Sequence, residues 1–299
     1  MTSITPEISE AKQDTKSEES GPANDLPMRF FSAAKGWQVI DLREIWRCRE
    51  LIWIFAQRDL KVRYRQTFIG IAWAVIQPVI TIAVFGVLFQ LLKSQPTTDA
   101  APFAVTIMCS LVPWRLFAHS LTQSTQSLVS NQHLITKVFF PRAILPISTL
   151  ASGMVDAAIA FIVLVIVMIY FGTVPTISIL FLPVMVLLVL LTSIAIGLWM
   201  SALNALYRDI QHAIPFLIQI GFFVSPVVYE TQAVIPEKWQ WLYSLNPMVG
   251  ILEGFRWTLI GQGPPPVMSL VVSTIFVFVV LVGGMIFFRR MERHFVDRI

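Results

Sequence analysis

The sequence predicts an all-α integral membrane protein with six transmembrane helices, an N-terminal amphipathic interface helix and two short re-entrant periplasmic helices. Composition is the first indication, because 56% of the 299 residues are hydrophobic, only 13% are charged and the mean hydropathy is +0.70. The second is a set of long runs without Asp, Glu, Lys or Arg. A helix that rises about 1.5 Å per residue needs roughly 20 such residues to cross hydrocarbon. These runs cover 66–92, 116–136, 157–207, 211–229 and 257–288.

The first 35 residues form a polar head that we expect to be disordered and cytoplasmic. They are rich in Ser, Thr, Glu, Lys and Pro and contain too few large apolar residues to bury a core. The first 65 residues carry eleven Lys or Arg against ten Asp or Glu, with no apolar core of signal-peptide type. The sequence therefore predicts an uncleaved first span whose start is held in the cytoplasm.

Residues 36–66 are expected to hold the amphipathic interface helix, with helical spacing from Asp41 to Tyr64. Apolar side chains at that spacing favour a helix lying on the inner leaflet. The apolar positions are Leu42, Ile45, Trp46, Trp53, Ala56 and Leu60. A plain connector between the polar head and the membrane is the alternative, because 51–56 is apolar all round.

The six-helix transmembrane domain is predicted over 67–290, followed by a cytoplasmic tail over 291–299. The expected spans are 68–92, 103–123, 144–171, 177–204, 210–229 and 267–288. With an even number of spans both termini lie on the same side. Eighteen Lys and Arg then fall inside and only Lys93, Lys238 and Arg256 outside, which indicates cytoplasmic termini.

The loop between the second and third spans predicts a short helix over about 131–140. Asn131 can cap it, and Pro141 ends it. Leu134, Ile135, Val138 and Phe139 would form one apolar stripe. So short a helix is marginal in water unless its stripe docks into a groove of another protein. Alternatively, it is a connector packed under its own bundle.

The outer segment from Ser225 to Pro266 is apolar and aromatic, but its prolines interrupt it too often for it to cross the membrane twice. Two half-helices, over 237–245 and 248–261, are expected to dip into the outer leaflet. Non-helical backbone at that depth must be buried in protein or line a wet cavity. We therefore call 230–262 the gate segment and expect it to cap a pathway.

Two charges fall inside predicted spans, Arg115 in the second and Asp156 in the third. Charged groups in hydrocarbon are costly and usually face a partner or a water-filled path. Their depths differ by about 6 Å if the helices are antiparallel, so they could pair. The alternative is that either residue lines the substrate path.

The chain lacks the sequence motifs of several classes of enzyme and metal site. The chain has no G-x-x-x-x-G-K-[ST], no G-x-S-x-G, no H-E-x-x-H and no Cys pair with metal spacing. Its four His are scattered singly, and it offers no basic face for nucleic acid. We therefore assign no catalytic residue, no metal and no nucleic-acid partner. Two membrane charges are also too few for an ion-coupled carrier, which points to an outside energy source.

Several stretches resemble the permease subunits of ABC-2 polysaccharide exporters, which export O-antigen, capsule and teichoic acid chains. The resemblance covers nearly everything after residue 40. The stretches are RDLKVRYRQTFIGIAWAVIQP (58–78), VPWRLF (112–117), LITKVFFPRAILP (134–146), YRDIQHAIPFLIQIGFFVSPVVY (207–229), NPMVGILEGFRW (246–257) and FFRRMERHFVDRI (287–299).

The resemblance implies a homodimer in the bacterial inner membrane, bound to two copies of a cytoplasmic ATP-binding subunit. This chain would hold no cofactor, and ATP and Mg would bind the partner. The short helix of 131–140 would be the coupling helix that contacts the ATPase, with Arg208 and Asp209 as a second contact. The gate residues would be Tyr229, Trp239, Trp241, Tyr243, Glu253 and Arg256.

A lipid-linked polysaccharide suggests roles for two more groups of residues. Arg58, Lys61, Arg63 and Arg65 could attract the diphosphate of the lipid carrier at the inner mouth, or could serve only to fix the topology. Aromatic side chains could offer flat faces to sliding sugars, or could simply pack or face lipid. The candidates for this sugar path are Trp73, Phe85, Phe89, Trp114, Phe117, Phe222 and Phe223.

The sequence therefore favours a transport subunit that exports a lipid-linked polysaccharide with ATP hydrolysed elsewhere. An ABC-2 exporter of drugs or lipids is the nearest alternative. A membrane-embedded glycosyltransferase would need an acidic catalytic centre that the sequence does not offer, and a membrane scaffold without a pathway is the remaining reading.

Overall fold

A computed structural model describes residues 42–65, 72–92, 103–173, 175–261, 264–292 and 295. The polar head of 1–35 and most of the tail of 291–299 lie outside the described residues. So do the side chains of Arg65, Phe85 and Phe89.

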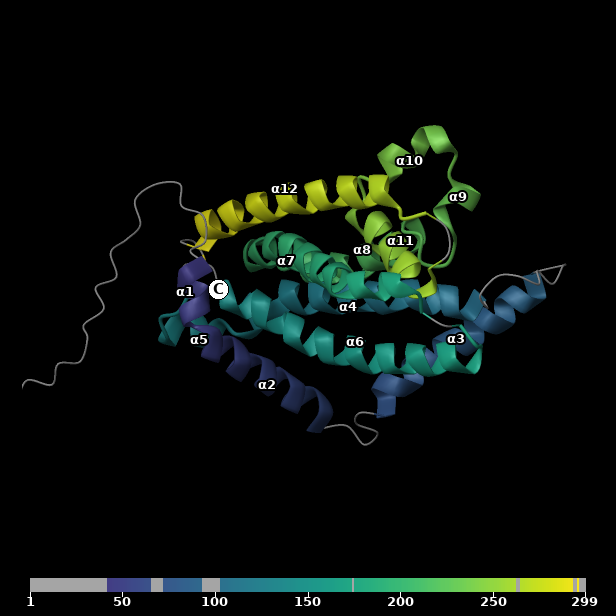
Figure 1. Cartoon of the computed structure of the whole chain (residues 1–299). Helices are drawn as coiled ribbons and strands as arrows, with labels where there is room; N and C mark the ends of the chain where they lie inside the picture. The colour runs from purple at the N-terminus through teal and green to yellow at the C-terminus, as the bar shows by residue number, and fades with distance from the viewer. Residues whose placement is uncertain are drawn as a thin grey trace, which may run out of the picture. The chain divides into compact units, whose positions relative to one another are not determined.

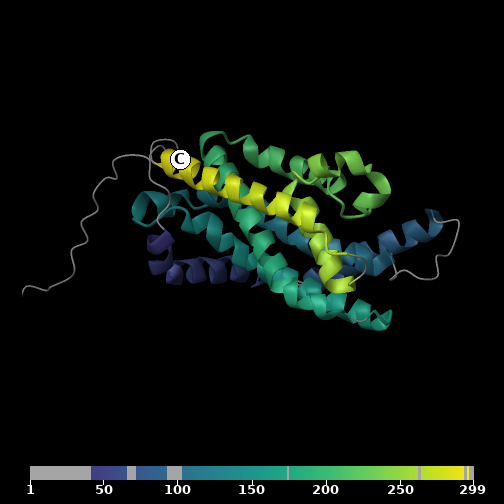
Figure 2. The same ribbon diagram turned by 45° about the horizontal axis from the view of Figure 1, so that its top comes forward.

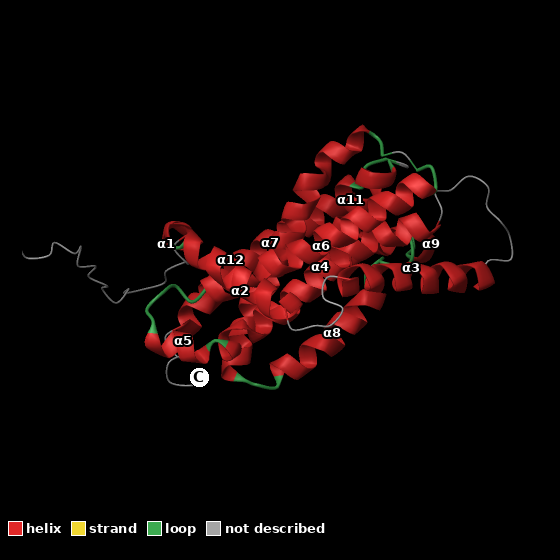
Figure 3. Ribbon diagram, turned by 90° about the horizontal axis from the view of Figure 1, so that it is seen from below, coloured by secondary structure: helices red, strands yellow, loops and turns green. Residues whose placement is uncertain are grey.

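The described residues form helices joined by turns (Figure 3). The prediction of an all-α fold is confirmed for this part of the chain. The bounds are α1 Leu42–Arg47, α2 Arg49–Arg65, α3 Ala72–Leu92, α4 Phe103–Ser130, α5 Gln132–Lys137, α6 Ile144–Tyr170, η1 Ile177–Phe181, α7 Leu182–Leu206, α8 Ile210–Val224, α9 Thr231–Val234, α10 Glu237–Tyr243, α11 Pro247–Ile260 and α12 Val267–Met291.

Each predicted span coincides with a helix, namely α3, α4, α6, η1 with α7, α8 and α12. Among the described residues, three helices are long and apolar enough to cross a membrane: Ile144–Tyr170, Ile177–Leu206 and Val267–Met291. The apolar helix α8 is shorter. It ends at Val224 because Pro226 follows, rather than at the predicted 229.

Helix α4 continues to Ser130, beyond its predicted end at 123. The polar residues after 121 stay within the helix, where their hydroxyls bond carbonyls one turn back. Thr122 donates to Ala118, Thr125 to Leu121 and Ser127 to Ser124, at 2.7–2.8 Å. The loop predicted to begin at 123 is therefore the last two turns of a helix.

Helix α4 is the central element of the bundle, since it contacts α3, α6, α7, α8 and α11. It lies beside α6 and α7 in both views, and α12 packs against α7 (Figures 1 and 2). The core around it is apolar and almost completely buried, as at Met108, Leu164, Val189 and Leu252.

Small residues allow the close helix crossings at α4. A Cβ on Gly153 of α6 would lie 2.8 Å from Ser120 Oγ, and one on Gly197 of α7 would lie 2.5 Å from Ser124 Oγ. Glycine facing serine lets two backbones approach closely, which is how helices associate in lipid. Neither serine hydroxyl has a hydrogen-bond partner among the residues that the structure describes. The small serine side chains instead pack directly against the two glycines.

The interface helix is two helices, α1 and α2, separated by a turn at Cys48. Its predicted apolar stripe is divided between buried and exposed positions. Ile45 and Ala56 are buried, but Trp46 and Trp53 are 69% and 62% exposed. Trp46 directly follows Ile45 and so lies about 100° from it around the helix. The exposed tryptophans therefore lie off the face that the rest of the chain buries.

Candidate functional site

The turn between α4 and α6 forms a corner at one end of the bundle, and α5 lies within it. The predicted apolar stripe is divided between two environments. Ile135 is buried, whereas Val138 and Phe139 are 54% and 74% exposed. The division arises because α5 ends at Lys137 and Val138 is already extended. Two apolar side chains are thus presented outward, while the start of the segment is fixed to its own bundle.

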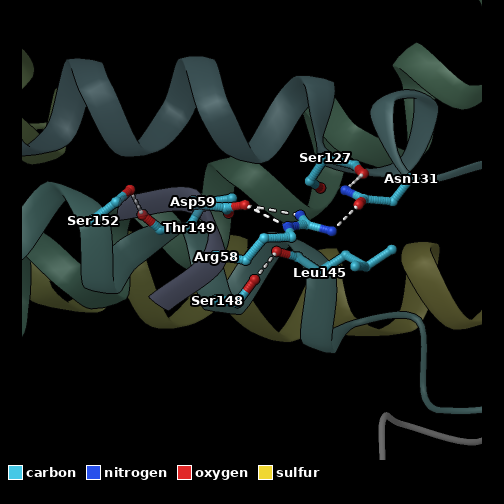
Figure 4. Close-up of polar contacts among 8 residues, drawn as sticks. All are labelled: Arg58, Asp59, Ser127, Asn131, Leu145, Ser148, Thr149 and Ser152. Carbon is cyan, nitrogen blue, oxygen red and sulfur yellow. Dashed lines mark hydrogen bonds and ion pairs between the residues drawn. The ribbon is translucent and has the colours of Figure 1, made fainter. Parts of the chain in front are cut away.

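Asn131 precedes α5, but its side chain makes no capping hydrogen bond, so the predicted capping role is wrong. Its Oδ1 accepts a 2.7 Å hydrogen bond from Arg58 Nη1, and its Nδ2 donates to the Ser127 carbonyl at 2.8 Å. Figure 4 shows Arg58 extended between Asn131 and Asp59. Arg58 forms a 2.8 Å ion pair with Asp59. Asn131 therefore joins the corner to the interface helix α2.

A second apolar cluster lies beneath this corner and draws on both ends of the described chain. Phe55 of α2 lies 5.8 Å from Phe140 between ring centroids. Phe288 of α12 lies 5.5 Å from Phe295. All four rings are buried. The cluster therefore places side chains of the corner in one buried core with side chains of α2 and α12.

Arg142 and Glu292 join the same corner to the end of α12. The Arg142 guanidinium donates to the Glu292 carbonyl, and its backbone N–H donates to the Glu292 carboxylate at 3.4 Å. Burial lowers the pKa of Arg142, and the Glu292 carboxylate opposes that shift. This contact could not be predicted, because nothing local in the sequence links residues so far apart.

The turn between α7 and α8 holds Arg208 and Asp209, and both are exposed as a contact surface requires. Buried Asn204 anchors the turn, because it donates to the Thr125 carbonyl at 2.9 Å and accepts from the Gln211 backbone at 3.0 Å. Thr125 lies near the α5 end of α4. The two predicted contact loops therefore lie at the same end of the bundle.

A polar cluster lies further along α6. Asp156 forms a 2.7 Å ion pair with Arg63 of α2. Arg63 Nη1 also lies 3.1 Å from His119 Nε2, which in turn lies 3.2 Å from Ser152 Oγ. Arg115 donates to the Gln77 side-chain oxygen and remains within electrostatic range of Asp156. The hypothesis of an Arg115–Asp156 pair therefore missed that α2 supplies a cation to Asp156.

The other predicted diphosphate-attracting cations differ in their surroundings. Lys61 is exposed. Arg58 and Arg63 keep 40% and 43% of their side chains exposed although each is paired. Both are therefore held in place and still accessible.

The candidate aromatics of the sugar path separate into buried and exposed groups. Trp114 and Phe117 are buried in the core, with ring centroids 5.6 Å apart, and Phe222 lies 6.0 Å from Trp114. Trp73 and Phe223 are 51% and 67% exposed. Within one chain, the buried rings act in packing.

The gate segment contains α9, α10 and α11, so short helices do occur near the two predicted positions. Tyrosine hydroxyls join α10 to the end of α8. Tyr243 donates to the Val224 carbonyl at 2.6 Å, and the hydroxyls of Tyr229 and Tyr243 are 2.8 Å apart. Burial, followed by the bond to Tyr229, raises the pKa of Tyr243 above its usual range. The neutral phenol is thereby favoured. Trp239 and Trp241 of α10 are both more than half exposed.

Asn246 and Arg256 fix α11 in place. Asn246 caps α11 by accepting from the Met248 backbone at 3.1 Å, and it also donates to Ser225 at 2.9 Å. Arg256 Nε donates to Ser110 of α4 at 2.7 Å, and its Nη2 donates to the Pro226 carbonyl. Glu253 accepts a 2.5 Å hydrogen bond from Ser269 of α12. The gate residues Glu253 and Arg256 thus join α11 to three neighbouring segments.

Comparison with known proteins identifies the family. Residues 50–260 match the model of the ABC-2 type transporter family. The chain belongs to the ABC-2 type transporter family. The match begins just after Cys48 and includes the α5 corner, the polar cluster and almost all of the gate segment.

Individual relatives of this ABC-2 protein are polysaccharide export proteins. The chain is 29% identical over 216 residues to an O-antigen export system permease protein of Myxococcus xanthus, covering 72% of this chain and 82% of that protein. It is 25% identical over 249 residues to an O-antigen export system permease protein of Klebsiella pneumoniae, covering 83% and 94%. It is 23% identical over 247 residues to a polysialic acid transport protein of Escherichia coli, covering 79% and 91%. The resemblance drawn from the sequence is confirmed.

Proposed function

We propose that this ABC-2 protein is the permease subunit of an exporter that moves a lipid-linked polysaccharide across the bacterial inner membrane. The observation that carries the proposal is similarity along nearly the full length of relatives named for O-antigen export and polysialic acid transport. The chain functions as a homodimer, and two copies of a separate ATP-binding subunit supply the energy.

All six apolar helices cross the membrane in this proposal, and both termini are cytoplasmic. The excess of Lys and Arg on the α5 side supports that orientation. Trp46 and Trp53 project from the interface helix toward the lipid headgroups, where tryptophan is enriched. Helices α10 and α11 re-enter from the periplasmic side.

The ATP-binding subunit docks on the α5 corner through Val138 and Phe139, with Arg208 and Asp209 as the second contact. An exposed aromatic beside a fixed helix is a suitable anchor for a groove on a partner. When the partner moves the corner, the Arg58–Asn131 bond transmits the motion to α2, and the Arg142–Glu292 contact transmits it to α12. Nucleotide hydrolysis is thereby coupled to the interface helix α2 and to the membrane-spanning helix α12.

At the opposite end, the gate segment closes the path. Its hydrogen bonds to α8, α4 and α12 are directional and few, so they can break together when those helices separate. The glycan chain follows the path between the inner mouth and this segment.

Deletion of the gene in its own organism tests the proposal. Polymerised glycan should accumulate on its lipid carrier on the cytoplasmic side and disappear from the cell surface. Expression of the full chain should restore surface glycan. Normal surface glycan in the deletion strain, with loss of drug resistance or of lipid transport instead, would favour the alternative ABC-2 exporter of drugs or lipids.

A further inference from the structure

A groove of about 390 Å³ lies between α7 and α12, which pack against each other. Both helices are long and apolar enough to cross a membrane. The rim of the groove is open, since Val279 is 65% exposed. The residues that line it are all apolar: Ile196, Trp199, Met200, Val279, Val280 and Gly283. The lining therefore suits a hydrocarbon chain rather than a sugar.

The groove depends on Gly283, and Trp199 gives it a fixed wall. A Cβ on Gly283 would lie 3.1 Å from the Trp199 ring, so a larger side chain there would occupy the hollow. Trp199 Nε1 donates to the Val280 carbonyl at 3.1 Å, and the ring stacks on Phe287 with centroids 4.5 Å apart. A wall that is already held in place costs little further ordering when a ligand enters.

Two arginines lie at the inner end of α12, beyond the groove. Arg290 follows Gly283 by seven residues, which places it about 10 Å along the helix and within about 20° of the same face. Arg290 is exposed. Arg289, beside it, forms a 2.6 Å ion pair with Glu292. A cation just beyond an apolar surface attracts the anionic heads of lipids in the inner leaflet.

We propose that the groove binds one acyl chain of an anionic phospholipid from the inner leaflet, whose phosphate lies at Arg290. This inference rests on the membrane orientation given with the proposed function, and it adds a ligand on the bilayer side of the bundle. A second copy of the chain fits this face less well. A symmetric contact through the groove would bring the Arg290 side chains of both copies together, and like charges repel.

The test is lipid retention by the full chain, extracted from nanodiscs with equal amounts of phosphatidylglycerol and phosphatidylcholine and analysed by native mass spectrometry. The unaltered chain should retain phosphatidylglycerol about fivefold more than phosphatidylcholine, the preference that one arginine near the headgroups contributes. Arg290→Gln should remove most of this preference. Arg47→Gln, which changes an exposed cation on α1, should leave it unchanged. Equal retention of the two lipids by the unaltered chain, or an unchanged preference in Arg290→Gln, would overturn the proposal.

Val279→Trp places an indole in the groove and should lower the retention of both lipids about threefold, because the acyl chain loses its packing contacts. Val271→Trp is the matched control, since Val271 is also exposed on α12 but does not line the groove. Ile196→Phe fills the groove from α7, which keeps the test decisive if Val279→Trp fails to fold.

Unchanged lipid retention in both groove-filling variants would overturn the proposal. If dimers also dissociate in these variants, the groove belongs to a second copy of the chain. The assay needs neither glycan nor ATPase, so its failure would leave the proposed export function standing. The deletion strain tests that function separately.

Discussion

Gly250 and Gly254 lie one turn apart on α11 and face different neighbours. A Cβ on Gly250 would run into the backbone carbonyl of Ser269, which cannot move without moving α12. A Cβ on Gly254 would lie 2.6 Å from Met185 Sδ, near the end of a flexible side chain that can turn aside. The same methyl group therefore meets a rigid obstacle at one position and a compliant one at the other.

We expect Gly250→Ala to destabilise the protein by about 1–3 kcal/mol, the usual cost of overpacking, and Gly254→Ala to cost less. The thermal unfolding midpoint of the purified protein in nanodiscs measures both. Gly254→Ala is the matched control, because it lies on the same helix and gains the same methyl group. Equal midpoints for the two variants would show that α11 does not contact α12 in this way.

The Tyr243 hydroxyl joins α10 to the end of α8, so Tyr243→Phe should cost about 0.5–1.5 kcal/mol. Tyr170→Phe is the control, since Tyr170 is 82% exposed at the end of α6. Thermal unfolding of the two variants provides the comparison. A loss of the same size in both would contradict the role assigned to the Tyr243 bond.

The raised pKa of Tyr243 also predicts a dependence on pH. The group binds its proton more tightly when folded, so its contribution to stability is present below about pH 10, the usual pKa of tyrosine, and is lost above it. The unfolding midpoint of the unaltered chain should fall above that pH by more than the midpoint of Tyr243→Phe. Parallel curves would contradict the raised pKa.

At the scale of elements, we expect different side chains of the α5 corner to serve docking and folding. The double variant Val138→Ser and Phe139→Ser should lower the affinity for the ATP-binding subunit roughly 10- to 100-fold. An aromatic side chain that becomes buried when two proteins bind contributes about 2 kcal/mol or more. The fold should survive, since both side chains are exposed. Ile135→Ser should instead lower the unfolding midpoint.

Ile177→Ser is the control for the docking measurement, because Ile177 is 86% exposed in η1, away from the corner. It should leave the affinity for the ATP-binding subunit unchanged in a pull-down with purified partners. Retained affinity in the Val138 and Phe139 variant would place the docking surface elsewhere.

The positions of the helices could be predicted from the sequence because hydropathy and proline act locally. Uncharged runs located the long helices, and Pro226 and Pro247 marked the ends of α8 and the start of α11. The turn at Cys48 was not predictable, because no helix breaker marks it. The end of α4 was misplaced because serine and threonine were read as loop residues, although their hydroxyls bond within the helix.

The partners of the candidate site residues were less predictable. Arg58 and Arg63 remain predicted cations of the inner mouth, but their contacts with Asn131 and Asp156 depend on how α2 aligns with α4 and α6. That alignment joins residues more than seventy positions apart. Burial of Trp114 and Phe117 likewise depends on which face of α4 the other helices cover.

At the scale of the whole molecule, the distribution of Lys and Arg predicts the orientation in the membrane, with both termini cytoplasmic. A fluorescent protein fused after Ile299 should fluoresce, and alkaline phosphatase fused there should be inactive. Phosphatase fused after Asp99, in the first loop expected outside, should be active. The reverse pattern would move the α5 corner to the periplasmic side and away from any ATPase.

The proposed function requires that movement at the α5 corner reaches the gate segment at the other end of the bundle. Under the proposed function, motion applied at the α5 corner reaches α2 and the end of α12, and the gate segment is bonded to α4, α8 and α12 at the other end. Helix α12 takes part in both sets of contacts. We therefore expect α12 to be the element through which nucleotide hydrolysis on one side opens a path on the other.

The most direct measurement is transport by the purified chain and its ATP-binding partner in proteoliposomes loaded with lipid-linked polysaccharide. We expect a complex with two copies of this chain, in which ATP hydrolysis moves the glycan to the opposite face, where an added glycosidase can digest it. A non-hydrolysing ATPase variant should leave the glycan protected. A chain that stays monomeric, binds no ATPase and leaves the glycan protected in the presence of ATP would contradict the account.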